Sequence, residues 1–214
     1  MIKPWTKQFL QLSVECQALR FGNFTLKSGR QSPYFFNAGL FSTGRTIDGL
    51  ASCYAHAIVD SGLEFDMLFG PAYKGIPLAT ATALCLSRDH GMNKPFAYNR
   101  KEAKDHGEGG TIVGAPLAGR VLIVDDVMTA GTAINEALSM IRAARAQPAG
   151  VAIALDRQEV APGHSRSAVE QVRDLGLEVI SVARLQDLLE WLRHKGQPEA
   201  DLDAMLGYRQ RYGA

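Results

Sequence analysis

The sequence has few cysteines, and none of them lies in a disulfide or metal-binding pattern. Its 214 residues include only Cys16, Cys53 and Cys85, which are far apart and form no CxxC pair. An odd number of widely spaced cysteines argues against a disulfide framework and against a zinc site. Because apolar residues surround each cysteine, we expect all three to be small buried side chains in a protein of a reducing compartment.

Long hydrophobic runs and an excess of either charge are also missing. No run approaches the roughly 20 residues that a membrane-spanning helix needs, and Glu15 and Arg20 interrupt the amphipathic N-terminal stretch, unlike a signal peptide. The 23 basic and 22 acidic residues leave a net charge of +1. Such a balance provides no global field to attract nucleic acid or an anionic membrane. We therefore predict a soluble cytoplasmic protein with neither partner.

Short apolar runs alternate with helix-like segments over most of the chain. Helical spacing predicts helices at residues 7–19 and 43–62, and two β-prone stretches within residues 24–39 predict a hairpin between them. Further strands are predicted at residues 65–70, 94–100, 121–126, 150–157 and 178–184, with helices after all but the second of them. This alternation indicates an α/β domain whose mainly parallel sheet is covered on both faces. We expect residues 1–40 to form a small N-terminal hood beside a core of residues 41–214.

Two adjacent acids end one of the predicted strands. Asp125 and Asp126 follow an apolar run and precede a turn of small residues, 129–133, that leads into a helix. Small residues let backbone N–H groups face an anion, and the helix N-terminus favours negative charge. The turn has neither the GK[ST] of a P-loop nor the GxGxxG of a dinucleotide fold. Carboxylates repel phosphate but accept hydrogen bonds from vicinal hydroxyls, so the combination suggests a ribose 5-phosphate. The alternative is that Asp126 merely caps the helix.

A second turn with an exposed backbone follows another strand. GPAYKG, residues 70–75, adds the positive charge of Lys74 to a turn of glycine, proline and alanine. It suits a second anionic group, although an ordinary turn with a solvated lysine would look similar. Since ligands of open parallel sheets bind at the carboxyl ends of strands, we expect the two turns to lie close together.

Residues 100–120 do not fit a packed element, since roughly a dozen of them lack any apolar period, and we predict a flexible loop at about 101–115. Arg100, Lys101, Lys104 and His106 cluster there among acidic residues and glycines. Loops of this length are commonly functional. The glycines would let this loop close over a site, where its cations would neutralise a polyanionic leaving group. A solvated mobile loop is the alternative.

The hairpin and one strand end supply further candidates. Phe35 and Phe36 are adjacent, so on a strand they face opposite sides. One can belong to the core, while the other could stack on a planar ring or make a hood or dimer contact. Lys27 could reach a substrate anion, and Arg157 could pair bidentately with a carboxylate. Both could also be ordinary surface charges.

These segments resemble a known family. VLIVDDVMTAGTA, residues 121–133, is similar to the phosphoribosylpyrophosphate (PRPP) binding signature of the type I phosphoribosyltransferases. Residues 24–41, 69–79 and 100–110 together resemble the bacterial orotate phosphoribosyltransferases. The resemblance implies the type I phosphoribosyltransferase fold, with a central mainly parallel sheet, flanking helices and an N-terminal hood. It also implies a homodimer in which the loop of one subunit closes over the site of the other.

The resemblance implies a reaction as well: PRPP and orotate give orotidine 5′-monophosphate and pyrophosphate. It assigns catalytic roles to Arg100, Lys104, His106, Asp125 and Asp126. It implies that PRPP is bound by Lys27, Tyr73, Lys74, Arg100, Lys101, Lys104, His106, Asp125, Asp126, Val127, Met128, Thr129, Ala130, Gly131, Thr132 and Ala133. Orotate would contact Lys27, Phe35, Phe36, Thr129 and Arg157. Mg²⁺ would be the cofactor, carried by PRPP and held by no direct protein ligand, with Asp125 reached through water.

Other functions remain open at this point. A type I phosphoribosyltransferase for a purine base would share the PRPP loop, although the hood residues and Arg157 favour a carboxylated pyrimidine. A PRPP-sensing regulator would bind without turnover, but such proteins usually carry a nucleic-acid surface. A purely structural α/β module would have no reason to gather anion-type sites at its strand ends.

Overall fold

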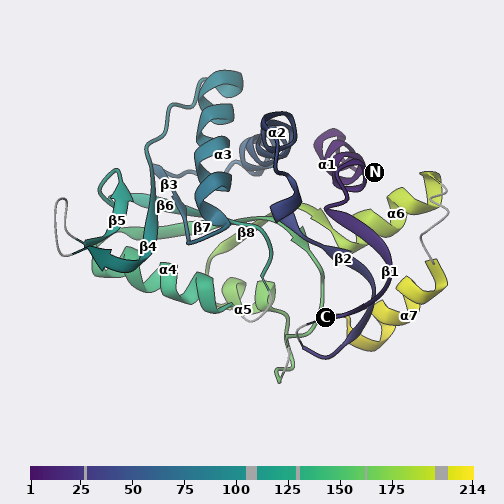
Figure 1. The fold of residues 1–214 in the computed structure, drawn as a ribbon. Helices are drawn as coiled ribbons and strands as arrows, with labels where there is room; N and C mark the ends of the chain where they lie inside the picture. The colour runs from purple at the N-terminus through teal and green to yellow at the C-terminus, as the bar shows by residue number, and fades with distance from the viewer. Residues whose placement is uncertain (27, 105–109, 129–130, 162, 196–201) are drawn as a thin grey trace.

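A six-stranded sheet forms the centre of the computed structural model, which describes residues 1–26, 28–104, 110–128, 131–161, 163–195 and 202–214 (Figure 1). The strand order is β5-β4-β3-β6-β7-β8, and all neighbours are parallel except β4 and β5. The strands are β3 (Met67–Gly70), β4 (Phe96–Lys104), β5 (Gly110–Gly114), β6 (Arg120–Asp125), β7 (Gln147–Asp156) and β8 (Glu178–Arg184). The predicted mainly parallel sheet is therefore confirmed.

Helices cover both faces of this sheet (Figure 1). Leu122 and Val124 of β6 pack into the core beneath α2 (Gly44–Ser61) and α3 (Gly75–His90). Val121 and Ile123 of the same strand join a second core with α4 (Thr132–Ala143) and α5 (Ala168–Asp174). A strand directs successive side chains to opposite faces, so an uninterrupted apolar run is what a sheet buried on both sides requires.

Local signals in the sequence fix the ends of helix α2. Thr43 and Thr46 form a reciprocal capping box at its start, and Gly62 adopts a left-handed conformation with φ of 70° at its end. The capping box satisfies backbone N–H groups that the first turn leaves without partners. Glycine takes the left-handed conformation without the steric cost of a Cβ. Both boundaries agree with the prediction.

The hood is a two-stranded antiparallel hairpin of β1 (Leu19–Thr25) and β2 (Gln31–Phe36), followed by the 3₁₀ turn Ala38–Leu40. The first helix, α1 (Pro4–Glu15), and the two last helices, α6 (Leu185–Lys195) and α7 (Leu202–Tyr212), lie on the same side of the molecule as the hairpin (Figure 1). Segments from both ends of the chain therefore build this region. Among the described residues, no helix combines the length and the apolar character needed to cross a membrane.

Several predicted boundaries differ from the structure, most clearly at the first helix and around β4 and β5. The first helix ends at Glu15 instead of residue 19, since Gln17 has a positive φ of 59° and Leu19 already begins β1. Strand β4 continues to Lys104, and Gly110–Gly114 pairs back with it as β5, within the segment predicted as a loop. Strand β5 is short and pairs with β4 through backbone hydrogen bonds, and its residues show no apolar alternation, so the sequence pattern did not reveal it. The flexibility of this segment stays a prediction.

Candidate functional site

The two predicted turns meet where β3 and β6 end. These strands are neighbours in the sheet, and their carboxyl ends, Gly70 and Asp125, lie at the same sheet edge. Strand β7, which ends at Asp156 beside Arg157, is the next neighbour of β6. The sheet thus brings together three chain segments that are far apart in sequence, at the edge where open parallel sheets bind ligands.

The acid pair is buried at this edge. Asp125 is 8% exposed and Asp126 is 7% exposed. The Asp126 N–H donates to Asp125 Oδ1 over 2.9 Å, and the hydroxyl of the buried Tyr54 donates to the Asp125 carbonyl over 2.6 Å. Burial, reinforced by the neighbouring Asp126 carboxylate, raises the pKa of Asp125 to about 7. Two buried acids side by side oppose folding, which points to a functional role for the pair.

Lys74 links the second turn to the acid pair. Its Nζ lies 2.6 Å from Asp126 Oδ2, and its side chain is 49% exposed. This ion pair connects the end of β3 to the end of β6, so the expected proximity of the two turns is confirmed. A lysine that is half in water can exchange one anionic partner for another at modest cost.

Close backbone packing explains why glycines begin and end this turn. A Cβ on Gly70 would lie 2.2 Å from the Gly75 carbonyl oxygen, and a Cβ on Gly75 would lie 2.8 Å from the Val124 carbonyl oxygen. The turn also has a partner that sequence reasoning missed. The N–H of Ala72 donates to Oδ1 of the buried Asn99 on β4 over 2.8 Å. Only the pairing of β3 with β4 brings Asn99 to this position.

The first cations of the predicted loop approach the same turn. Tyr73 is exposed, and the Lys101 ammonium lies 4.8 Å from the centre of its ring. Arg100, one residue earlier on β4, is half-buried. The Lys104 side chain and His106 lie outside the described residues, so their predicted roles remain predictions.

The predicted phosphate turn leads directly into helix α4. Val127 and Met128 are half-buried, and Gly131 is the N-terminal capping residue of the helix with φ of 71°. Thr132 and Ala133 form the first turn of the helix, so their N–H groups belong to a helix N-terminus beside the acid pair. Thr129 and Ala130 lie outside the described residues.

In the hood, the side chains of the two adjacent phenylalanines face opposite sides of β2, as the sequence alternation predicts. Phe36 is buried, and its ring centre lies 5.8 Å from that of Phe9. Phe35 is half-buried on the other face, with its ring centre 5.6 Å from that of Phe24. Phe36 is packed into the hydrophobic core, and the predicted contacts of both rings with the base stay predictions. Lys27 lies outside the described residues.

Arg157 is buried, which excludes the alternative of a solvated surface charge. Its side chain is 11% exposed, and its Nε donates to Glu159 Oε1 over 2.7 Å. The guanidinium carbon lies 4.7 Å from the centre of the Tyr34 ring in the hood. Sequence reasoning missed Glu159, although an acid two residues after a strand-end arginine was a visible signal.

The acid pair is the part of the site that could interact with a metal. Among the described residues, no group of three or more His, Cys, Asp or Glu side chains is placed to hold a metal ion. Two adjacent carboxylates supply hard oxygen atoms, which suit Mg²⁺ that keeps waters and is held mostly by substrate phosphates. The residues present therefore fit the expected mode of binding.

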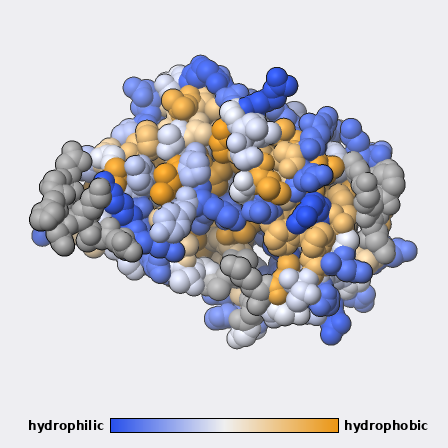
Figure 2. Space-filling view, in the orientation of Figure 1, coloured by the Kyte–Doolittle hydropathy of each residue, from blue (hydrophilic) through white to orange (hydrophobic). Residues whose placement is uncertain are grey.

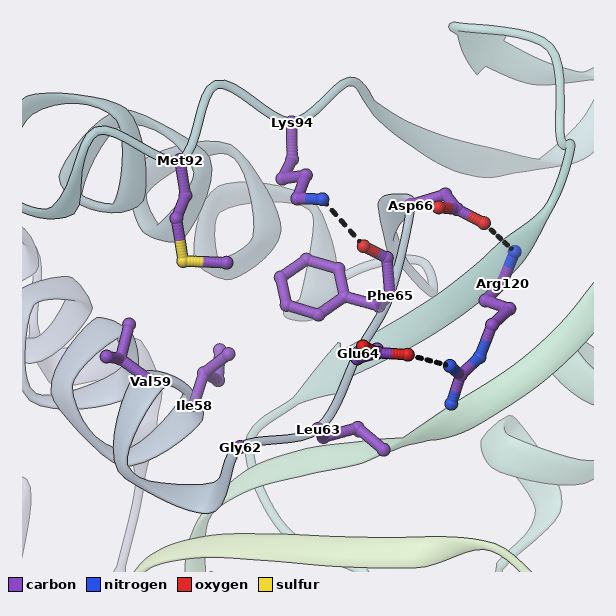
Figure 3. Close-up of a pocket in the computed structure, with 10 residues that line it drawn as sticks. All are labelled: Ile58, Val59, Gly62, Leu63, Glu64, Phe65, Asp66, Met92, Lys94 and Arg120. Atoms are coloured by element: carbon purple, nitrogen blue, oxygen red, sulfur yellow. Dashed lines mark hydrogen bonds and ion pairs between the residues drawn. The ribbon is translucent and has the colours of Figure 1, made fainter.

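A pocket of about 450 Å³ lies elsewhere, at the opposite edge of the sheet, where β3 and β6 begin (Figure 3). Its polar groups are already paired: Lys94 Nζ donates to the Phe65 carbonyl over 2.8 Å, and Arg120 Nη1 lies 3.1 Å from Glu64 Oε2. With these groups satisfied, we assign the pocket no chemistry.

Comparison with known proteins identifies relatives over the full chain. Residues 44–176 match the family model described as phosphoribosyl transferase domain. A protein from Thioalkalivibrio sulfidiphilus, named orotate phosphoribosyltransferase, is 58% identical over 99% of this chain and 100% of its own length. A protein of the same name from Salmonella typhi is 55% identical with the same coverage.

Solved structures give a consistent result. The crystal structure of orotate phosphoribosyltransferase from Francisella tularensis is similar to this one with a TM-score of 0.87 and 41% identity, covering 96% of this chain and 99% of that chain. The match includes the hood as well as the sheet, since it extends over almost the whole of both chains.

Proposed function

Because the chain belongs to the orotate phosphoribosyltransferase family, we propose that it transfers the 5-phosphoribosyl group from PRPP to orotate. The products are orotidine 5′-monophosphate and pyrophosphate, and the reaction belongs to pyrimidine (UMP) biosynthesis. One observation of the structure supports the proposal most directly: the buried Asp125–Asp126 pair lies between the N-terminus of α4 and Lys74. These three features suit the ribose hydroxyls, the 5′-phosphate and the diphosphate of PRPP, in that order.

In the proposed complex, the acids accept hydrogen bonds from the ribose hydroxyls, and residues 127–133 hold the 5′-phosphate. Tyr73, Lys74, Arg100 and Lys101 bind the diphosphate, together with Lys104 and His106. The observed Lys74–Asp126 ion pair would then be replaced. Lys74 would turn to the diphosphate, and Asp126 would gain a ribose hydroxyl, so neither group would be left unpaired on binding.

Magnesium is the cofactor that we propose for this reaction. Bound mainly to the phosphate and hydroxyl oxygens of PRPP, it would supply charge stabilisation to the leaving diphosphate. Asp125 is the protein group that could reach it through water. A cation there would favour the charged form of Asp125, whose pKa burial and the neighbouring Asp126 raise.

The chemistry makes few demands on acid or base groups. Displacement at the anomeric carbon develops positive charge on the ribose and negative charge on the diphosphate. In the proposed complex, Asp125 and Asp126 would stabilise the positive charge, and Lys74 and the loop cations would stabilise the negative charge. The orotate ring carries its own negative charge when deprotonated, so the attack needs no strong general base.

The hood and the end of β7 would recognise orotate. We propose that Arg157 and Lys27 bind its carboxylate, that Thr129 contacts the ring and that Phe35 and Phe36 line the pocket of the base. Phe36 supports the hood from within the core. Arg157 would disfavour bases without a carboxylate, because the guanidinium edge away from Glu159 would then lack an acceptor.

We also propose a homodimer in which the loop of each subunit closes over the partner's site. Leu84 on α3 is exposed, as is Tyr73 at the site, and Figure 2 shows hydrophobic and hydrophilic residues side by side between α3 and the hood. Mixing two variants tests the shared site: Lys104→Ala lacks a loop cation, and Asp126→Ala lacks a ribose ligand. Restored activity in the mixture supports sharing, whereas a mixture as inactive as its components contradicts it.

The function itself is tested by following the absorbance of orotate. The purified protein is mixed with orotate, PRPP and Mg²⁺, and each of the last two is omitted in turn. We expect loss of orotate only when both are present. Adenine in place of orotate is the control for a purine enzyme, and PRPP binding without turnover of either base would identify a regulator instead.

A further inference from the structure

One buried ionic cluster takes no part in the proposed handling of PRPP. It contains Arg157 and Glu159 after β7, Arg30 and Tyr34 of the hood hairpin, and Tyr212 at the end of α7. The side chain of Glu159 is 13% exposed, close to the value for Arg157, and buried charges of this kind require a reason because desolvation is costly.

A tight turn after β7 brings Arg157 and Glu159 together. The N–H of Gln158 donates to Oδ1 of the buried Asp156 over 2.8 Å, and Gln158 itself has a positive φ of 50°. A left-handed conformation is uncommon for a residue other than glycine. It lets the side chains on either side of Gln158 meet, so that Arg157 Nε donates to Glu159 Oε1 over 2.7 Å.

Glu159 fixes one edge of the guanidinium. Arg157 Nη2 lies 3.4 Å from the hydroxyl of Ser32 on β2, while Nε is bonded to Glu159. The Tyr208 hydroxyl on α7 also lies beside Arg157. A guanidinium is planar and carries five N–H donors. Because the group is rigid, a hydrogen bond that holds Nε also fixes the direction of the edge formed by Nη1 and Nη2.

Glu159 is itself anchored from two sides. The Tyr34 hydroxyl donates to Oε1 over 3.3 Å, and Arg30 Nη1 lies 3.7 Å from Oε2. The backbone of Glu159 forms a β-bridge with Gly213, and the Val160 N–H donates to the Tyr212 carbonyl over 2.9 Å. The hood and the C-terminal segment thus hold the carboxylate in place.

The charges of this cluster do not balance. Two guanidinium groups, of Arg30 and Arg157, surround the single carboxylate of Glu159, while Tyr34 stays neutral because burial raises its pKa. One unit of positive charge remains in a mostly desolvated position. A second carboxylate, supplied by a ligand at the open edge of Arg157, would complete the pairing.

We propose that Glu159 is a positioning residue that holds Arg157 in the plane needed to bind the carboxylate of the pyrimidine substrate. This inference rests on the proposed function, since it assumes that orotate is the base. Glu159 does not touch the substrate; it limits the rotation of the guanidinium so that little orientational entropy is lost on binding. Removal of Glu159 should therefore weaken orotate binding selectively and leave PRPP binding almost unchanged.

The test compares Glu159→Ala, Glu159→Gln and the wild-type protein in initial-rate kinetics, with each substrate varied at saturation of the other. We expect Glu159→Ala to raise the KM for orotate about tenfold, the effect of losing a hydrogen bond between charged groups, with the KM for PRPP changed less than about twofold. Glu159→Gln should show a smaller increase, because its amide oxygen can still accept from Arg157. Glu64→Ala, at an exposed ion pair on the opposite sheet edge, is the control and should match the wild type.

Two kinds of result would overturn the proposal. If the wild-type protein consumes orotate but the KM for orotate is unchanged in Glu159→Ala, or rises in proportion to that for PRPP, the positioning role is wrong while the proposed function stands. If Glu159→Ala fails to fold, the Gln variant provides the same comparison, because it preserves the size and the acceptor atom. A wild-type protein that leaves orotate untouched would refute the proposed function, and the inference with it.

Discussion

Replacing Asp125 by asparagine should stabilise the ligand-free protein while damaging its activity. The change keeps the side-chain shape and the Oδ1 atom that accepts the hydrogen bond from the Asp126 N–H. It removes a carboxylate that is 8% exposed and lies next to a second acid. Active sites hold such unfavourable groups because the ligand, and not the folded chain, supplies their partners.

The size of the gain follows from the pKa of Asp125, which burial and then Asp126 raise from 3.8 to about 7. A raised pKa of an acid means that the folded state binds the proton more tightly than the unfolded state, so stability is greatest below about pH 4 and falls as pH rises toward 7. Each pKa unit corresponds to about 1.4 kcal/mol, so ionising Asp125 lowers the free energy of unfolding by roughly 4 kcal/mol at pH 8 and roughly 2 kcal/mol at pH 5. An asparagine does not ionise and avoids this loss.

Thermal unfolding without substrates or Mg²⁺ measures the effect. For a chain of this length, about 1 kcal/mol corresponds to roughly 2–4 °C. We therefore expect Asp125→Asn to raise Tm by roughly 10 °C at pH 8, and by about half as much at pH 5. Asp60→Asn, at an exposed ion pair with Lys3, should show no such pH-dependent gain. If Asp125→Asn melts at or below the wild-type temperature at pH 8, or gains equally at both pH values, the buried acid does not carry the cost assigned to it.

Three further changes test other parts of the molecule. Lys104→Ala should lower kcat far more than it weakens PRPP binding, and a change confined to KM would argue against a role in the transition state. Tyr54→Phe removes the hydroxyl that bonds the Asp125 carbonyl, so denaturant unfolding should show a loss of about 1–3 kcal/mol; no loss would mean that water replaces the hydroxyl. Gly70→Ala places a Cβ 2.2 Å from the Gly75 carbonyl oxygen and should lower both stability and PRPP affinity. Gly207→Ala is the control: its Cβ meets open space on helix α7, so the change should be neutral or slightly stabilising.

The sheet and most of its helices were predictable because each element carries its own signal. Buried parallel strands such as 121–126 are continuous apolar runs, and helix α2 is bounded by a capping threonine and a left-handed glycine. Strand β5 was not predicted, because its pairing to β4 is made by backbone hydrogen bonds and its five residues are too few to show an apolar period. Helix α1 was extended too far for a related reason: Leu19 fits a helical period, yet pairing with Phe36 places it in β1.

The site was predictable where adjacent residues share a function and was not where the fold brings distant residues together. The acids 125–126 and the turn 70–75 are short contiguous patterns that the sequence displays. Asn99 holds the Ala72 N–H only because β3 and β4 are neighbours. Glu159 meets Tyr34 and Arg30 only because the hood folds back over the end of β7. Such contacts depend on topology, which local periodicity does not encode.

The two ion pairs of the site differ in exposure, and this difference suggests how each behaves when substrate binds. Lys74 is 49% exposed and pairs with Asp126 across two separate turns, so it can leave that partner for a diphosphate without entering or leaving the protein interior. Arg157 and Glu159 are both largely buried and lie two residues apart on one rigid turn, so separating them would leave two desolvated charges. The first pair is suited to exchange. The second is suited to remain intact and to present a fixed edge to the base. The exposure of the basic partner therefore separates the pair that can exchange from the pair that stays intact.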